Sequence, residues 1–170
     1  MATFGDTTPG SAGFPNSGDR ALASKYTLSE GATLNTAYAY IHSGSAGGNA
    51  KVLIYSDGGA NPGTLIAASA GAAITGVGWM SCGAISGSLV AGDYYLVFVG
   101  DANSYPSYIG DDNGSGPNLL MANGTLSYAS PPSSWPGTDA DYGPAGVNVY
   151  IDYTASGGGL IPRAMLLGAG

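Results

Sequence analysis

The chain has 170 residues, enough for one domain, and only 9% of them are charged. Four Lys and Arg stand against eleven Asp and Glu, a formal net charge of −7, which excludes a basic nucleic-acid groove. Disorder is excluded as well, because 44% of the residues are hydrophobic and 12 are Tyr. No apolar run approaches the roughly 18 residues of a membrane-spanning helix, so we expect neither a nucleic-acid nor a membrane partner.

Glycine and proline, at 30 and 10 residues, point to an all-β chain rich in turns. Each Gly weakens a helix interior by roughly 1 kcal/mol relative to Ala, and Gly recurs along the whole sequence. Residues 1–20 are dominated by Gly, Pro, Ser, Asp and Asn, with isolated Phe4 and Phe14. We therefore expect an extended N-terminal arm over residues 1–20.

The first predicted strands cover residues 21–29, 33–42 and 50–55. In the first, Leu22 and Tyr26 are candidate inward residues. In the second, strict alternation places Leu34, Tyr38 and Tyr40 on one face, and it places Ala37, Ala39 and Ile41 on the other. The third ends at Asp57-Gly58-Gly59, a turn in which Gly accepts positive φ.

Short strands follow over residues 64–70 and 76–84, and a strong one follows over residues 93–99. The sequence DYYLVFV of the strong strand is β-branched and aromatic on both faces, which favours a central position in a sheet. Residues 101–146 read as long loops with short strands at 119–122 and 125–129. The last predicted strand covers residues 146–154. We expect a core that contains Val52, Ile54, Leu96, Phe98, Val149 and Ile151.

About eight strands with turns every 8–12 residues predict an antiparallel β-sandwich or jelly roll over residues 21–155. Residues 156–170 follow as a Gly linker and an apolar tail. The tail's large apolar side chains make it a candidate assembly clamp, since an uncovered apolar peptide costs solubility. They are Leu160, Ile161, Met165, Leu166 and Leu167.

Two stretches carry a resemblance to a known class of modules. They read VLIYSDGGANPGTLIA at residues 52–67 and LVAGDYYLV at residues 89–97. Both are similar to stretches of the bacterial choice-of-anchor β-sandwich domains, which are related in shape to carbohydrate-binding jelly rolls. Such modules also occur in phage virion proteins. The resemblance implies a sandwich fold and leaves the function open.

Catalysis is not expected, and we predict no cofactor. The single His, His42, ends a predicted strand, and no G-x-S-x-G elbow presents a nucleophile. Cys82 has no basic neighbour in sequence to lower its pKa, so a small buried thiol is the better interpretation. We predict no metal site; Asp101, Asp111 and Asp112 are weak calcium candidates whose spacing does not meet the EF-hand pattern.

Aromatic residues in the region 101–146 are the candidate recognition surface. Their rings suit either sugar stacking, with acidic neighbours accepting hydroxyl hydrogen bonds, or a subunit interface. A third interpretation is that they only cover the core beneath long loops. The candidates are Tyr105, Tyr108, Asp111, Asp112, Trp135 and Tyr142.

Two functions remain open. The first is a non-enzymatic structural protein of a phage or similar particle, a decoration, tail or fibre subunit that assembles with copies of itself and other virion proteins. The second is a secreted or surface carbohydrate-binding or adhesion module with a glycan partner. The start of the sequence, MATFGD, has no basic and apolar secretory signal. With the apolar tail, this favours the first function and a virion protein made in the host cytoplasm over an extracellular location.

Overall fold

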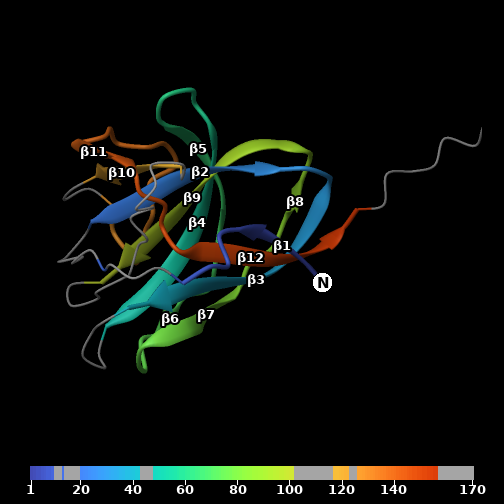
Figure 1. Ribbon diagram of the computed structural model, residues 1–170, viewed down its shortest axis with the longest axis horizontal. Coiled ribbons are helices and arrows are strands. Elements are labelled where there is room, and N and C mark those ends of the chain that lie inside the picture. Colours follow the sequence, from blue (N-terminus) through green and yellow to red (C-terminus); the bar gives the residue numbers. More distant parts are fainter. Residues whose placement is uncertain (10–12, 14–19, 43–47, 102–116, 123–125, 157–170) are drawn as a thin grey trace, which may run out of the picture.

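The computed structural model describes residues 1–9, 13, 20–42, 48–101, 117–122 and 126–156. The secondary-structure elements within these ranges are all β-strands. They form two antiparallel sheets packed together as a β-sandwich (Figure 1). Their bounds are β1 (Ala2–Gly5), β2 (Ala21–Leu28), β3 (Ala32–Ile41), β4 (Asn49–Asp57), β5 (Pro62–Ala68), β6 (Ala72–Ala73), β7 (Gly78–Ala84), β8 (Ser88–Leu89), β9 (Gly92–Gly100), β10 (Asn118–Ala122), β11 (Ala140–Pro144) and β12 (Val149–Ala155).

The five-stranded sheet has the order β1-β12-β3-β7, with β8 also paired to β3. The seven-stranded sheet has the order β11-β10-β2-β9-β4-β5, with β6 paired to β4. The first and last strands are neighbours, because Ala2 pairs with Tyr153 and Phe4 with Ile151. β10 and β11 lie at the end of the molecule opposite Met1 and the end of β12 (Figure 1).

The space between the sheets holds the main hydrophobic core. The predicted core is confirmed here, since all six side chains expected in it are fully buried: Val52, Ile54, Leu96, Phe98, Val149 and Ile151. The inward positions of β2 are confirmed in the same way, with Leu22 buried and Tyr26 packed against this core.

A second hydrophobic core lies on the outer face of the seven-stranded sheet. β9 explains it, because Leu96 and Phe98 point to the main core while Val97 and Val99 point outward and are equally buried. The expectation of a central strand apolar on both faces is thus confirmed, with β9 between β2 and β4.

Residues 126–139, the cover segment, pack on this outer face. Tyr55 donates its hydroxyl hydrogen bond to the carbonyl of Pro132 (2.8 Å), and its ring meets the indole of Trp135 edge to face at 5.8 Å between centroids. The N–H of Trp135 donates to the carbonyl of Gly63 (3.0 Å), so the segment also runs along β5. Lys51 donates to the carbonyl of Tyr128 (3.1 Å) and lies over its ring.

Four expectations need correction: three concern where strands lie, and the fourth concerns the faces of β3. Residues 2–5 belong to a sheet and not to an arm: Phe4 is buried in the main core and the strand is held by its pairing with β12. The short strand expected at 125–129 is absent from its described part, residues 126–129, which begin the cover segment. Finally, β11 lies where only loop was expected.

Leu34 does not share a face with Tyr38 and Tyr40. In the register with β12, Thr36 pairs with Asp152 and Leu34 with Tyr153, so Asn35 is an extra residue in β3. Such a bulge shifts the alternation by one. Leu34 is therefore buried together with Ala37, on the inner face.

Candidate functional site

A pocket of about 470 Å³ opens on the outer face of the seven-stranded sheet. Five elements build it: β2, β9, β10, β11 and the turn between β4 and β5. Its floor follows from strand pairing, because Lys25 of β2 lies opposite Tyr95 of β9, and Tyr95 lies opposite Tyr55 of β4. The lining residues are Lys25, Gly59, Ala60, Tyr95, Pro117, Asn118, Leu120 and Asp141.

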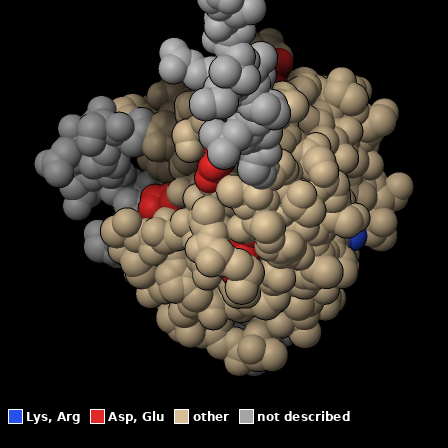
Figure 2. All heavy atoms as spheres, turned by 90° about the vertical axis from the view of Figure 1, so that its right-hand side faces the viewer, with Lys and Arg blue, Asp and Glu red and all other residues tan. Residues whose placement is uncertain are grey.

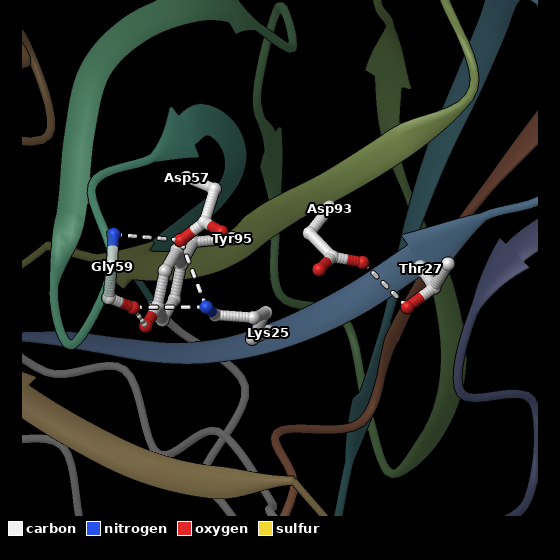
Figure 3. Close-up of polar contacts among 6 residues, drawn as sticks. All are labelled: Lys25, Thr27, Asp57, Gly59, Asp93 and Tyr95. Carbon is white, nitrogen blue, oxygen red and sulfur yellow. Dashed lines mark hydrogen bonds and ion pairs between the residues drawn. The ribbon is translucent and has the colours of Figure 1, made fainter.

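Lys25 is held in a network of fixed contacts (Figure 3). Its Nζ lies 2.8 Å from Asp57 Oδ1 and donates to the carbonyl oxygen of Gly59 (2.9 Å). The Tyr95 hydroxyl donates to the same carbonyl (3.0 Å), and the Gly59 N–H donates to Asp57 Oδ1 (2.8 Å). The ammonium also lies 5.3 Å from the centre of the Tyr95 ring, within reach of a cation–π interaction.

The network keeps both charges ionised. The hydrogen bond with Asp57 raises the pKa of Lys25, and the same bond, with the Gly59 N–H, lowers the pKa of Asp57. Burial raises the pKa of Tyr95. The Lys25–Asp57 pair is therefore neutral as a unit. Tyr95, which keeps its proton, lines the same side of the pocket.

The opposite wall carries a second polar pair. Asn118 Nδ2 donates to Asp141 Oδ2 (3.1 Å), while the N–H of Gly143 donates to Asp141 Oδ1 (2.8 Å). Leu120 lies opposite Asp141 in the pairing of β10 with β11, and its apolar side chain lines the pocket between the two walls. The pocket thus has hydrogen-bonding groups on two sides and apolar surface between them.

A second surface lies on the outer face of the five-stranded sheet. There, Tyr38 and Tyr40 of β3, Trp79 of β7 and Tyr150 of β12 form one aromatic cluster, here called the tyrosine face. The strand neighbours of the three tyrosines point into the main core, and Met80, next to Trp79, packs against it. All four aromatic side chains are half-buried. Tyr38 pairs directly with Tyr150, and Tyr40 pairs directly with Trp79.

The rings of the tyrosine face pack on one another. Tyr38 and Tyr150 are stacked with centroids 4.7 Å apart and an interplanar angle of 11°. Trp79 meets Tyr150 at 4.7 Å and Tyr40 at 5.4 Å, both in tilted, edge-type contacts at 68°. Tyr38 and Tyr150 therefore turn a ring face toward each other rather than toward solvent.

Two of the aromatic residues predicted at the recognition surface are described. Trp135 belongs to the cover segment: its indole contacts Tyr55, and its Nε1 donates to Thr138 Oγ1 (3.1 Å). Tyr142 in β11 is 45% exposed and donates to the sulfur of Met121 at 3.8 Å. Outside the described residues lie four candidates from the loop, Tyr105, Tyr108, Asp111 and Asp112, and all five from the tail, Leu160, Ile161, Met165, Leu166 and Leu167.

Asp101 is the one calcium candidate within the described ranges. Its carboxylate accepts a hydrogen bond from Asn49 Nδ2 (2.6 Å). Among the described residues, no three His, Cys, Asp or Glu side chains gather in a group that could hold a metal ion. Cys82 is fully buried, and burial raises the pKa of its thiol to about 12, so it is unsuited to act as a nucleophile.

The two surfaces differ in how visible they are in the sequence. The alternation of β3 already puts Tyr38 and Tyr40 on one face. In the same way, the alternation of β12 puts Tyr150 on the face opposite to that of the apolar Ile151. In contrast, the polar residues of the pocket, Lys25, Asn118 and Asp141, come from three separate strands and share no local pattern. Only the order of the strands brings them together.

No family model, curated protein or solved structure matches the chain. Nor do the residues that the structure describes include a helix with the length and apolar character of a membrane span. The functional argument therefore depends on the two surfaces themselves.

Proposed function

We propose that this chain is a non-enzymatic structural subunit that works by assembling with copies of itself on a phage or similar particle. The observation that carries the proposal is the tyrosine face. Tyr and Trp are enriched in protein interfaces and dominate their binding energy, because they bring a large, rigid contact area and a polar edge. A sheet face with four such rings is suited to contact another protein.

Charge supports the same proposal. Asp152 is the only charged residue in β3, β7 and β12, the three strands that carry the tyrosine face. Two copies of a chain with a net charge of −7 repel each other, and they meet at lowest cost across a surface with little charge. The end of the molecule near Met1 also displays mainly uncharged residues, with few Asp or Glu and little Lys or Arg in view (Figure 2).

The ring geometry argues against sugar stacking at this face. A sugar ring stacks on an aromatic ring whose face is open to solvent. The faces that Tyr38 and Tyr150 turn toward each other are closed to a sugar, and Trp79 packs against Tyr150 as well. The cluster is thus better matched to a protein partner than to a polysaccharide.

The strand order supports a jelly roll. The sheets contain the series β1-β12-β3-β7 and β2-β9-β4-β5, and β10 and β11 extend the second sheet. Jelly rolls of eight strands serve in viral capsids and in lectins, so this likeness is an analogy of fold and agrees with both functions considered. The virion location is carried over from the sequence: it depends on the apolar tail, and on the occurrence in phage virion proteins of the modules that residues 52–67 and 89–97 resemble.

Analytical ultracentrifugation of the full chain over a range of concentrations tests the proposal. We expect a defined oligomer for the native sequence and a shift toward monomer for the double variant Tyr38→Ser, Tyr150→Ser. Ile66→Ser is the control, because it removes an exposed apolar side chain from β5 of the other sheet. A native chain that sediments as a monomer, or a double variant that is folded and fully oligomeric, contradicts an interface at the tyrosine face.

Deletion of residues 157–170 tests the clamp separately. The truncated chain keeps β12 and Ser156, whose N–H donates to the carbonyl of Gly31 (2.8 Å), and we expect it to fold. Loss of assembly on truncation would assign the contact to the tail, and normal assembly would refute the clamp. The tail and the tyrosine face are thereby distinguished in one set of sedimentation runs.

A further inference from the structure

We propose that the pocket between Lys25 and Asp141 binds an uncharged hexose unit of a glycan. This inference is independent of assembly, because the pocket lies on the seven-stranded sheet and the tyrosine face on the other. The pocket volume, about 470 Å³, falls within the roughly 300–1,000 Å³ typical of ligand sites.

The remaining hydrogen-bonding capacity of the pocket fits hydroxyl groups. Lys25 has three N–H donors, and its contacts with Asp57 Oδ1 and the Gly59 carbonyl account for two of them. Among the described residues, each Asp141 oxygen accepts one hydrogen bond, and a carboxylate oxygen has a further lone pair. Asn118 contributes an amide oxygen and a second N–H beyond the one given to Asp141. Since a sugar hydroxyl both donates and accepts, neighbouring hydroxyls can use donors and acceptors that lie side by side.

The charge of the pocket selects against anions. The Lys25–Asp57 pair is neutral as a unit, and Asp141 adds a negative charge on the opposite wall. A phosphate, sulfate or carboxylate would be repelled by Asp141, whereas an uncharged polyol would not. Pro117, Leu120 and Ala60 supply apolar surface suited to the C–H groups of a sugar ring.

The pocket is also held in shape before any ligand arrives. Gly59, at its rim, is fixed by Lys25, Tyr95 and Asp57 together, and Asp141 is fixed by the backbone of Gly143. A site whose polar groups are already positioned loses less entropy on binding.

Saturation-transfer NMR on the full chain tests the proposal, since it detects weak binding to assemblies of any size. The probes are the methyl glycosides of glucose, galactose and mannose, and N-acetylglucosamine, at up to about 50 mM to reach millimolar dissociation constants. Methyl phosphate is the anionic probe. We expect transfer to at least one of the four sugars and none to methyl phosphate.

Variants place the binding in the pocket. Asp141→Asn should weaken it about tenfold or more, because a hydrogen bond to a charged acceptor is lost. Asp152→Asn, the same change on the other sheet, should leave it unchanged. Ala60→Trp, at an exposed rim position, should abolish binding by filling the pocket while the folded circular dichroism spectrum is kept.

The proposal is overturned if none of the four sugars receives transfer, if methyl phosphate binds, or if Ala60→Trp binds sugar as well as the native chain. An effect of Asp152→Asn equal to that of Asp141→Asn would also overturn it. Failure here is distinct from failure of the assembly proposal, which is read from sedimentation and not from sugar binding.

Discussion

The two outer faces of the sandwich differ in how their apolar area is shielded from solvent. On the seven-stranded sheet the outward side chains include Leu53, Val97 and Val99, which carry no polar group, and the chain's own cover segment buries them. On the five-stranded sheet the outward positions hold Tyr38 and Tyr150, whose rings are half-buried by their neighbours and end in hydroxyl groups.

The difference shows how much the choice of side chain decides. Purely apolar residues on a second sheet face require a cover, since exposed apolar patches cost solubility. Tyrosines bring apolar area with a polar tip and need no intramolecular cover. Within the described ranges, the chain thus covers one face with its own cover segment, while the other carries half-buried tyrosines, which form the proposed interface.

The largest expected loss of stability comes from substitutions on the two faces of β9. Phe98→Ala should destabilise the domain by about 3–5 kcal/mol, because it leaves a cavity in the main core. Val97→Ala should cost about 1–3 kcal/mol if the outer face is a true second core. Thr33→Ala, at an exposed position of β3, should stay within about 0.5 kcal/mol.

Urea denaturation followed by tryptophan fluorescence gives the three free energies of unfolding. A cost for Val97→Ala no larger than that for Thr33→Ala would show that the outer face of the seven-stranded sheet is not a core.

The cover segment can be loosened at Trp135. Trp135→Ala should cost about 2–3 kcal/mol, less than for a fully buried indole, because the side chain is half-buried against Tyr55. Trp135→Phe keeps a ring there and loses the hydrogen bond to Thr138, so it should cost about 0.5–1.5 kcal/mol. Thermal unfolding by calorimetry measures both, and equal costs would mean that the ring contact contributes little.

A glycine pair tests how closely the cover segment approaches the turn between β5 and β6. Gly71 has φ +84° and a methyl group there would collide with the hydroxyl of Tyr128; Gly143 has φ +71° and open space around it. Both Ala variants carry the strain of left-handed backbone, roughly 1–2 kcal/mol. Gly71→Ala should be the more destabilising of the two in chemical denaturation. If the two variants are equally stable, Tyr128 is not packed against Gly71 as described.

The smallest effect concerns pH. Burial raises the pKa of Tyr55 to about 12, above its ordinary value near 10. A folded-state pKa above the unfolded one means that the stabilisation is complete below about pH 10 and is lost as the pH rises through 12. Tyr55→Phe should cost about 1 kcal/mol at neutral pH, from the lost bond to Pro132, and should reduce the fall of stability between pH 10 and 12. Unfolding curves at several pH values check this, and an unchanged slope would contradict it.

The sequence predicted the sandwich because its strongest signals are local. The alternation of Val149 and Ile151, and the run in β9 that is apolar on both faces, require no knowledge of neighbouring strands. β1 was missed because it has only four residues, and its stability comes from β12 at the far end of the chain. The bulge at Asn35 was missed because it exists only in the register between two strands.

The candidate surfaces also differ in whether local sequence or strand pairing determines them. Half of the tyrosine face is visible as Tyr38 and Tyr40 in one alternating strand, and the other half depends on which strands are neighbours. The pocket depends wholly on strand order, because Lys25, Asn118 and Asp141 meet only when β2, β10 and β11 lie side by side.

The pairing of β1 with β12 has a consequence for how the protein folds. In the five-stranded sheet, β12 lies between β1 and β3, so this sheet lacks one of its two interior strands until residue 155 has been synthesised. The seven-stranded sheet has all its strands by residue 144. Closing a loop of nearly the whole chain is slow, and long-range pairing of this kind places sandwiches among the slower-folding domains. On the ribosome, the seven-stranded sheet should therefore form first, and β12 should enter between β1 and β3 as the final step.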